Sequence, residues 1–584
     1  DVPTLVPNFS VGINCYYLYA GTELYSGANG LDQDIIELTD NVTWFMGKHT
    51  LVFGTHNEFF KFGNLFIRDI TGTWQFSNLD NFAIGKASRY ELSYSNVAGE
   101  PRWWANFNVA QLGFYVGDTY AVRPNVSLTF GLRMDVPIVT DNPSYNPRTE
   151  EVFGLRTDEV ATGNMLWSPR LGFNWDVFQD QKTIVRGGAG IFSGRTPYVW
   201  ISNQFSNTGI EFTRYDIRSN VPTFVADPNN QPKGFGSASN EVDVMDPNFK
   251  FPQVFRTDFG FDRELPYAMK ATVELIWSKN LSEVLYQNPN LVKTGNDPID
   301  MRPLYKSRKD STLTDLIYLT DTSAGYQYSL SFQLQKNFGK GAWLNGSYTY
   351  GEARDVNSAS SSQARSSFQY NHISGDPNAP YLVASNQDIR HRIAFGASYT
   401  MNFIPVAPTT LSIFYNGRSG RPYSTRYSND LNGDGSSYND CIYVPATSDE
   451  VIVTGGTWDD LNTYISGDPG LDNARGSVVW RNASREPWYH RVDFRLLQDV
   501  NIPKLEGHKF QFSLDIMNFL NLFNSDWGNY RYVYYRGDSP LTNNGVDAAT
   551  GKQKIYFNRS NQRRYDMDQL LSRWQMQLGF RYIF

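Results

Sequence analysis

The last twelve residues of the chain alternate between polar and apolar side chains. Every second position is apolar: Trp574, Met576, Leu578, Phe580, Tyr582 and Phe584. The other positions are mostly polar or small: Arg573, Gln575, Gln577, Gly579 and Arg581, with Ile583 as the exception. A period of two is that of a β-strand with one apolar and one polar face. We therefore predict a strand that separates an apolar environment from a wet one.

The same alternation recurs far upstream, between Val126 and Val136. Leu128, Phe130 and Leu132 point one way in the predicted strand. Arg133 and Asp135 point the other way. Charges on the second face are tolerable only if that face is wet, as in the lumen of a membrane barrel. A soluble edge strand is the alternative for the C-terminal segment, but the aromatic last residue resembles the assembly signal of outer-membrane barrels.

Short turns and long polar stretches alternate along the whole chain, which predicts about seven hairpins. The turns fall at Met46–His49, Val122–Asn125, Val177–Gln181, Glu264–Tyr267, Asn337–Lys340, Asn402–Pro408 and Ile502–Gly507. The long stretches are Gly63–Asn106, Gly194–Phe251, Lys279–Gly325, Gly351–Asp388, Arg418–Trp488 and Phe519–Arg573. This sorting is typical of a transmembrane antiparallel β-barrel with periplasmic turns and extracellular loops.

A periplasmic C-terminus places every long stretch outside the cell. An additional outgoing strand near Val11–Tyr19 and the final strand bring the expected total to about 16. No stretch approaches the roughly 20 apolar residues of a membrane-spanning helix. We predict an all-β fold and one domain over residues 1–584, located in a bacterial outer membrane.

Composition agrees with a barrel and excludes other classes. Aromatic residues form 15% of the chain, but the hydrophobic fraction is only 40% and the mean hydropathy is −0.46. A thin apolar band, aromatic girdles and a polar lumen together give these values. The net charge of −7 argues against a nucleic-acid partner. The two cysteines, Cys15 and Cys441, are expected to be free or buried thiols.

Four segments resemble the barrel of TonB-dependent outer-membrane transporters, and most of all the Oar-like group of Bacteroidota. They begin QLGFYVGDTYAVRPN (Gln111), SPRLGFNWDVFQDQK (Ser168), NQDIRHRIAFGASYT (Asn386) and FSLDIMNFLNLFN (Phe512). The resemblance implies a 22-stranded barrel preceded by a TonB-binding segment and a plug. Neither is recognisable in this sequence, so we expect the C-terminal portion of such a barrel. A complete barrel of about 16 strands is the alternative.

By this resemblance, the function is active import of a scarce nutrient through a plugged barrel, driven by TonB of the inner membrane. A structural or secretion-associated barrel, acting as an adhesion scaffold or passive pore, is the alternative. Outer-membrane lipid and lipopolysaccharide, TonB and a surface lipoprotein are the expected partners. We expect no enzyme, because no acid, base or nucleophile set points at one place, and the six histidines carry no catalytic motif.

One loop carries a metal-ligand pattern, in the segment NDLNGDGSSYNDCIYVP. Asp430, Asn432, Asp434, Gly435 and Ser436 match the opening of the D-x-[DN]-x-[DN]-G calcium loop, which aims oxygens at one point. Asp440 is the candidate for the last ligand, because the twelfth position is Cys441. The sequence predicts a structural Ca²⁺ in an extracellular loop. A turn that uses the same residues for backbone reasons is the alternative.

Other polar and aromatic residues allow two interpretations. Loop aromatics could stack on a ligand or anchor loops at the membrane interface: Trp200, Tyr215, Tyr423, Trp458 and Trp527. Arg390, His391 and Arg392 could attract an anion, but pairing with loop acids or lipopolysaccharide is favoured. The glycines of RGGAGIF (Arg186–Phe192) lie in an alternating strand, which favours sheet curvature or lumen space over a phosphate site.

Overall fold

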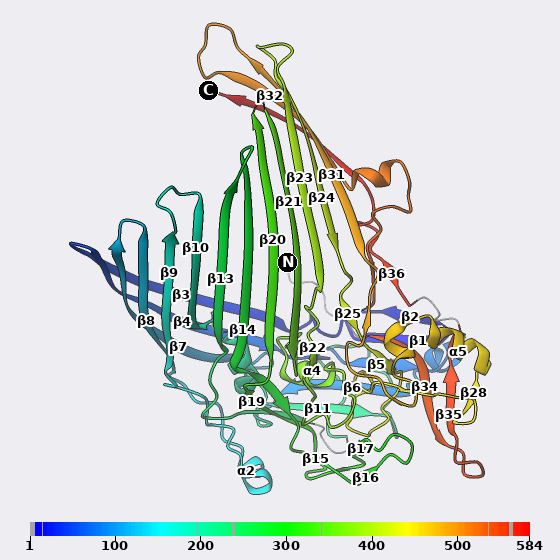
Figure 1. Ribbon diagram of the computed structural model, residues 1–584. Helices are drawn as coiled ribbons and strands as arrows, with labels where there is room; N and C mark the ends of the chain where they lie inside the picture. Colours follow the sequence, from blue (N-terminus) through cyan, green and yellow to red (C-terminus); the bar gives the residue numbers. More distant parts are fainter. Residues whose placement is uncertain are drawn as a thin grey trace.

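The computed structural model describes residues 6–13, 16–195, 197–235, 240–339, 341–534, 537–559 and 564–584. Its main feature is a tall antiparallel sheet of fifteen strands (Figure 1). In chain order the strands are β3 (Asn29–Met46), β4 (His49–Phe66), β7 (Ala105–Arg123), β8 (Val126–Val139), β9 (Leu166–Asp176), β10 (Thr183–Ser193), β13 (Gln253–Leu265), β14 (Met269–Gln287), β20 (Tyr326–Gly339), β21 (Ala342–Asp355), β23 (His391–Met401), β24 (Thr409–Arg418), β31 (Tyr489–Asn501), β32 (Lys509–Met517) and β37 (Gln575–Ile583).

Each of these strands pairs in antiparallel register with the next one along the chain, from β3 to β37. Among the described residues, β3 pairs only with β4 and β37 only with β32. The sheet is therefore a barrel wall with two unpaired edges, and Figure 1 shows it curving around an open side. The predicted all-β barrel fold and its short turns are confirmed.

The expected barrel strand near Val11–Tyr19 is wrong, and the wall has fifteen strands instead of about 16. β1 (Asn8–Ile13) and β2 (Tyr16–Ala20) pair with each other, and β1 pairs in parallel with β5 (Thr73–Phe76). Val11 is buried against Trp74 in the core of this smaller sheet. An alternating pattern shows that one face is apolar, but it does not show whether lipid or another protein layer covers that face.

The two faces of the wall have the predicted polarity. Phe130 and Leu132 are exposed on the outer face, whereas Arg133 and Asp135 form an ion pair on the inner face, with 2.6 Å between Nη2 and Oδ1. Near the loop end, outward rings form a belt of the kind found at membrane interfaces: Tyr348, His391, Trp488, His490 and Tyr415. Among the described residues, no helix is long and apolar enough to span a bilayer.

The long connections fold into a dense tier at one end of the wall (Figure 1). A five-stranded sheet joins β11 (Phe212–Ile217), β6 (Arg89–Ser95), β5, β1 and β2. A four-stranded sheet joins β26 (Thr425–Tyr427), β34 (Asp538–Val546), β35 (Gln553–Phe557) and β28 (Val451–Thr454). β12 (Asn240–Met245) and β19 (Leu313–Thr322) are parallel and extend the wall from β14, and β22 (Val383–Ala384) pairs with β21.

Short elements complete the tier. Its helices are α1 (Leu79–Ala83), α2 (Pro147–Phe153), α3 (Val199–Ser206), α4 (Ala364–Gln369), α5 (Trp458–Ser466) and α6 (Pro469–Asp472). The 3₁₀ turn η1 (Phe519–Leu522) lies apart from the tier, against β31 of the wall. Two-residue strands pair as β15 (Leu291–Val292) with β18 (Ser307–Arg308), β16 (Gly295–Asn296) with β17 (Pro303–Leu304), β25 (Pro422–Tyr423) with β30 (Ser484–Arg485), β27 (Tyr443–Val444) with β29 (Ser477–Val478) and β33 (Arg531–Tyr532) with β36 (Asp566–Met567).

Candidate functional site

The inner face of the wall carries charged side chains, and many of them are held in ion pairs. Arg186 Nη1 lies 2.9 Å from Glu274 Oε1, and Arg186 Nε lies 3.3 Å from Asp262 Oδ2. The inward-facing rows of β31 and β32 likewise pair Arg495 with Asp515. These pairs are partly exposed, so they hold side-chain positions with little gain in stability. A face of this kind suits contact with water or with a polar protein surface.

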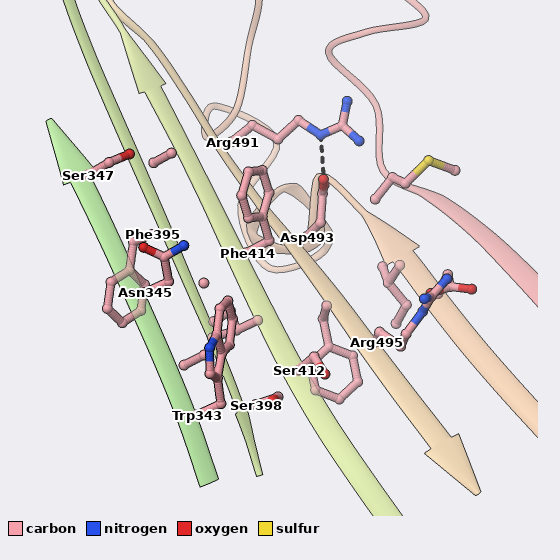
Figure 2. A pocket seen from close by; sticks show the side chains of 18 of the residues that line it. Trp343, Asn345, Ser347, Phe395, Ser398, Ser412, Phe414, Arg491, Asp493 and Arg495 are labelled. Carbon is pink, nitrogen blue, oxygen red and sulfur yellow. Dashed lines mark hydrogen bonds and ion pairs between the residues drawn. The ribbon is translucent and has the colours of Figure 1, made fainter. Parts of the chain in front are cut away.

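A recess of 600 Å³ is hollowed in this inner face, where β21, β23, β24, β31 and β32 meet (Figure 2). Trp343 and Phe414 lie on either side of Gly396, and a Cβ at Gly396 would meet the Trp343 ring at 3.3 Å. The glycine therefore gives the rings room to lie against the sheet. On the far side, Arg491 donates from Nε to Asp493 Oδ1 at 2.6 Å.

The recess combines flat apolar rings with polar groups that surround them. Its polar lining includes Asn345, Ser347, Ser398, Ser412 and Gln577. Alternation identified the inner face but did not single out this place. The available signal was an aromatic residue in an otherwise polar inward row, as at Trp343 and Phe414, and its neighbours become visible only once the registers of five strands are known.

The predicted calcium loop forms a compact unit in the tier. Asp430 accepts from the backbone N–H groups of Gly433 (2.7 Å) and Gly435 (2.9 Å). Asp434 accepts from Ser436 N (2.8 Å) and from Asn439 Nδ2 (2.7 Å). The structure thus brings Asp430, Asn432 and Asp434 into one turn. Ser436 instead donates from its hydroxyl to the carbonyl of Gln369 (2.8 Å).

Asp440 lies at the end of this loop and links it to the loop that contains Arg302. Its Oδ2 accepts from the backbone N–H of Leu431 (2.8 Å), and its Oδ1 lies 3.1 Å from Arg302 Nη1. Arg302 also lies 2.7 Å from Asp300 and donates to the Cys441 carbonyl at 2.7 Å. Both charges of the Arg302–Asp440 pair are buried, with side chains 1% and 0% exposed. Asp440 thus has a structural role that the sequence did not indicate.

Burial and mutual repulsion leave the carboxyl groups of this loop hard to ionise. Burial raises the pKa of Asp434 to about 8, and the nearby charges of Asp440 and Asp430 add to the effect. Burial also raises the pKa of Asp440 to about 6, although the Arg302 charge opposes the rise. Within the described ranges, no three His, Cys, Asp or Glu side chains converge as a metal site. The Ca²⁺ site stays a prediction.

The loop aromatics are mostly core residues of the tier. Tyr215 and Tyr423 are buried, and Trp200 and Trp458 pack against buried clusters. Trp527 is 51% exposed. Four of the five residues therefore have a packing role in this structure.

The basic segment at Arg390 is paired with acids. Arg390 bonds Asp388 and Glu352, each at 2.9 Å, and His391 contacts the Tyr348 hydroxyl through Nδ1 at 2.8 Å. The favoured pairing with loop acids is therefore observed for Arg390.

Two smaller predictions agree with the structure: a strand at the glycine-rich segment Arg186–Phe192, and a buried free thiol at Cys441. Gly187 and Gly188 are inside strand β10, as expected. Cys441 is a buried free thiol, and burial raises its pKa to about 12. Cys15 lies outside the described residues.

A family model described as "Outer membrane beta barrel domain" matches residues 2–530. The chain belongs to this outer-membrane β-barrel family. The match covers the wall from β3 to β32 and the loops between these strands, and it agrees with the outward apolar and inward charged rows. No curated protein sequence matches the barrel.

Solved structures of similar fold include three outer-membrane proteins. The outer membrane transporter YddB from Escherichia coli shares 11% identity at a TM-score of 0.48, over 99% of this chain and 57% of that one. The ferric enterobactin receptor PfeA from Pseudomonas aeruginosa shares 8% identity at a TM-score of 0.44, over 98% of this chain and 55% of that one. The FrpB iron transporter from Neisseria meningitidis shares 10% identity at a TM-score of 0.42, over 84% of this chain and 51% of that one. The barrel thus spans little more than half the length of these proteins.

Proposed function

We propose that this chain forms most of the wall of an outer-membrane transporter that imports a scarce nutrient actively. The observation that carries the proposal is the direction of the two unpaired edges. β3 and β37 both run from the loop tier toward the short-turn end, as the first and last of fifteen antiparallel strands must. Because the two edge strands run in the same direction, they cannot pair with each other in the antiparallel way that the rest of the barrel uses. An odd number of further strands is therefore needed, which gives at least 16.

A barrel of that size is too wide for its own side chains to fill. Barrels of 16–18 strands leave an aqueous channel, and those of 22 strands hold a plug. The charged inner face agrees with either kind of lumen. We propose the plugged kind, because the segments that resemble TonB-dependent transporters imply a barrel of 22 strands; the seven strands that such a barrel still needs are an odd number, as the parallel edges require. Further strands, the plug and the TonB-binding segment would be supplied by the same polypeptide outside residues 1–584.

The same proposal fixes orientation and partners. The loop tier faces the cell exterior and the C-terminus the periplasm, where TonB engages the plug segment. Lipid and lipopolysaccharide surround the outer belt, and a surface lipoprotein is a further partner of the tier. The four segments given above support placement in the Oar-like group of Bacteroidota.

Two measurements on the whole polypeptide purified from its outer membrane test this function. The first is conductance in planar bilayers of phosphatidylcholine in KCl, and the second is binding of the isolated periplasmic domain of TonB. An importer is closed to ions and binds TonB. Steady conductance without TonB binding would identify a passive pore. A barrel that neither conducts ions nor binds TonB would be identified as a scaffold.

We also propose that the loop around Asp434 holds a structural Ca²⁺, with oxygens from Asp430, Asn432, Asp434 and Asp440. Two features support it. The carboxyl groups of Asp430, Asp434 and Asp440 lie close enough to repel one another, and Asp440 is paired with the buried Arg302, so a divalent cation would offset their repulsion. In addition, Asn439 is fully buried with its amide against Asp434, and its Oδ1 has no hydrogen-bond partner. Amide oxygens are ordinary calcium ligands.

Terbium luminescence provides the test. The EGTA-treated protein is titrated with Tb³⁺, which takes calcium sites, and Ca²⁺ is then added in competition. The proposal expects a saturable signal that Ca²⁺ abolishes and that Asp434→Asn removes. Asp449→Asn is the matched control, because its side chain is 92% exposed in a neighbouring loop. An equal signal in both variants, or none in the wild type, refutes the site.

A further inference from the structure

Two segments at the loop end of the last two strands form a small unit with an apolar exterior. The unit, here called the apolar knob, consists of Phe519–Trp527 and Leu570–Trp574. Its exposed apolar side chains are Leu520, Leu522, Phe523, Trp527, Leu570, Leu571 and Trp574. Phe523 and Leu570 are 68% and 70% exposed. A cluster of this kind on a protein surface marks contact with a non-aqueous phase or with a partner.

The interior of the apolar knob is polar. Asn518, which is 1% exposed, donates from Nδ2 to the carbonyls of Gly528 (3.1 Å) and Ser572 (3.2 Å). Asn521 accepts from Trp574 N at 3.2 Å and donates to the Trp527 carbonyl at 2.8 Å. Four backbone groups are thus hydrogen-bonded from inside while apolar chains point out. A segment that faces lipid needs such internal partners, because lipid supplies none.

The apolar knob lies on the outer surface of the wall. The Phe519 ring stacks on Phe494, with centroids 5.1 Å apart. Phe494 is level with Ile413 in the outward row of β24 and β31, and Ile413 is exposed on that face. Trp574 continues the outward row of β37, which includes Met576 and Leu578. The unit therefore extends from the lipid-facing side and not from the lumen.

The lengths of β32 and β37 indicate where the apolar knob lies along the membrane normal. β32 and β37 have nine residues each. Nine residues of a strand tilted by about 40° rise about 23 Å, nearly the whole apolar band of about 25 Å. The apolar knob begins where that band ends. The polar residues Ser525, Asp526 and Arg573 are exposed at its margin, as expected for a unit at a membrane boundary.

From these observations we infer that the apolar knob inserts into the bilayer at the loop end of the barrel and contacts lipid acyl chains near the headgroups. It anchors the loop between β32 and β37 sideways in the membrane. This inference rests on membership in the outer-membrane barrel family and does not depend on whether the barrel is an importer, a pore or a scaffold.

Depth-dependent fluorescence quenching tests the inference on the whole polypeptide in phosphatidylcholine vesicles. Cys15→Ser and Cys441→Ala give a background without thiols. Single cysteines at Leu570→Cys, Leu578→Cys and Ala549→Cys carry the fluorophore nitrobenzoxadiazole. Ala549 is exposed at the tip of the β34–β35 hairpin, and Leu578 is exposed on the outer face near the middle of β37. The vesicles contain lipid with a doxyl quencher at carbon 5 or carbon 12.

The label at position 570 should be quenched at least twofold more by the shallow than by the deep doxyl group. At position 578 the deep quencher should be the stronger, and at position 549 both should be weak. If position 570 behaves like position 549, the apolar knob does not enter lipid and the inference is wrong. If positions 570 and 578 both escape quenching, the placement of β37 in the membrane also fails, whatever the transport assay shows.

Discussion

Replacing Arg302 by methionine should open the loop tier while leaving the barrel wall assembled. Methionine keeps the volume of the side chain but leaves Asp300 and Asp440 without their shared partner, all within a buried site. Removing one member of a buried ion pair typically costs about 3–5 kcal/mol. Since about 1.36 kcal/mol is a factor of ten, the opening equilibrium of this loop should rise by about two to four orders of magnitude.

Hydrogen exchange measures this change directly. The peptide that contains Cys441 and Ile442 reports on the loop, because their backbone N–H groups donate to the Ile373 carbonyl (2.9 Å) and the Thr425 carbonyl (3.2 Å). Its protection should fall by at least a hundredfold in Arg302→Met, whereas a peptide from β8 should be unchanged. A loss of protection below tenfold would refute the reasoning, since it would mean that Arg302 contributes no more than a surface arginine.

Two further variants separate charge from packing. Arg308→Met is the matched control, because Arg308 donates to the Tyr305, Ser307 and Gly433 carbonyls (2.9, 3.3 and 3.1 Å), and its loss should cost about 1 kcal/mol for each bond. The triple variant Asp300→Asn, Arg302→Met, Asp440→Asn removes all three charges. It should recover most of the protection, because uncharged groups need no counter-ion.

Three other predictions concern pH and the two faces of the wall. Burial raises the pKa of Asp538 to about 6 from an ordinary value of 3.8, so the contribution of this group to the stability of the tier is greatest below pH 4 and falls by about 3 kcal/mol as the pH rises to 6; the difference in melting temperature between the wild type and Asp538→Asn should follow this slope. Leu578→Arg should lower folded barrel in the outer membrane, at a cost of about 2–4 kcal/mol near mid-bilayer, whereas Gln577→Arg on the inner face should assemble normally; equal yields on heat-shift gels would contradict the assignment of faces. Arg186→Gln should change the unfolding free energy by less than about 1 kcal/mol, because its pairs with Glu274 and Asp262 are partly exposed; a larger loss in urea melts would show that this network stabilises the wall.

Much of the wall was predictable from the sequence because lipid and water impose opposite demands on successive residues. The alternation at Val126–Val136 and at the C-terminus gave both faces correctly, and the turns followed from short gaps between alternating runs. The prediction of a barrel strand at Val11–Tyr19 was wrong because a strand that is buried in a protein core has the same alternating pattern as a strand that faces lipid. Local sequence carries no information about what covers an apolar face.

The candidate sites were less predictable, because they depend on residues brought together from distant segments. The turn at Asp430–Asp434 was visible as a motif, but the role of Asp440 depends on Arg302, which is 138 positions away. The inner recess needs five strands in register before Trp343 and Phe414 become neighbours of Arg491. The apolar residues of the Phe519–Trp527 segment were included in a loop described as polar, since its composition alone did not show which side chains point outward.

The interlocked loop tier also constrains the order in which the molecule can be made. β26 pairs with β34, and β28 with β35, so strands from the Arg418–Trp488 connection lie beside strands from the final connection. A hydrogen bond from Thr454 Oγ1 to the Ile555 carbonyl joins residues 101 positions apart. Contacts of such long separation form slowly. In the orientation proposed above, they also require the last connection to have crossed the membrane, so the tier can be completed only after the final hairpin has been inserted, which makes its completion a late step in biogenesis.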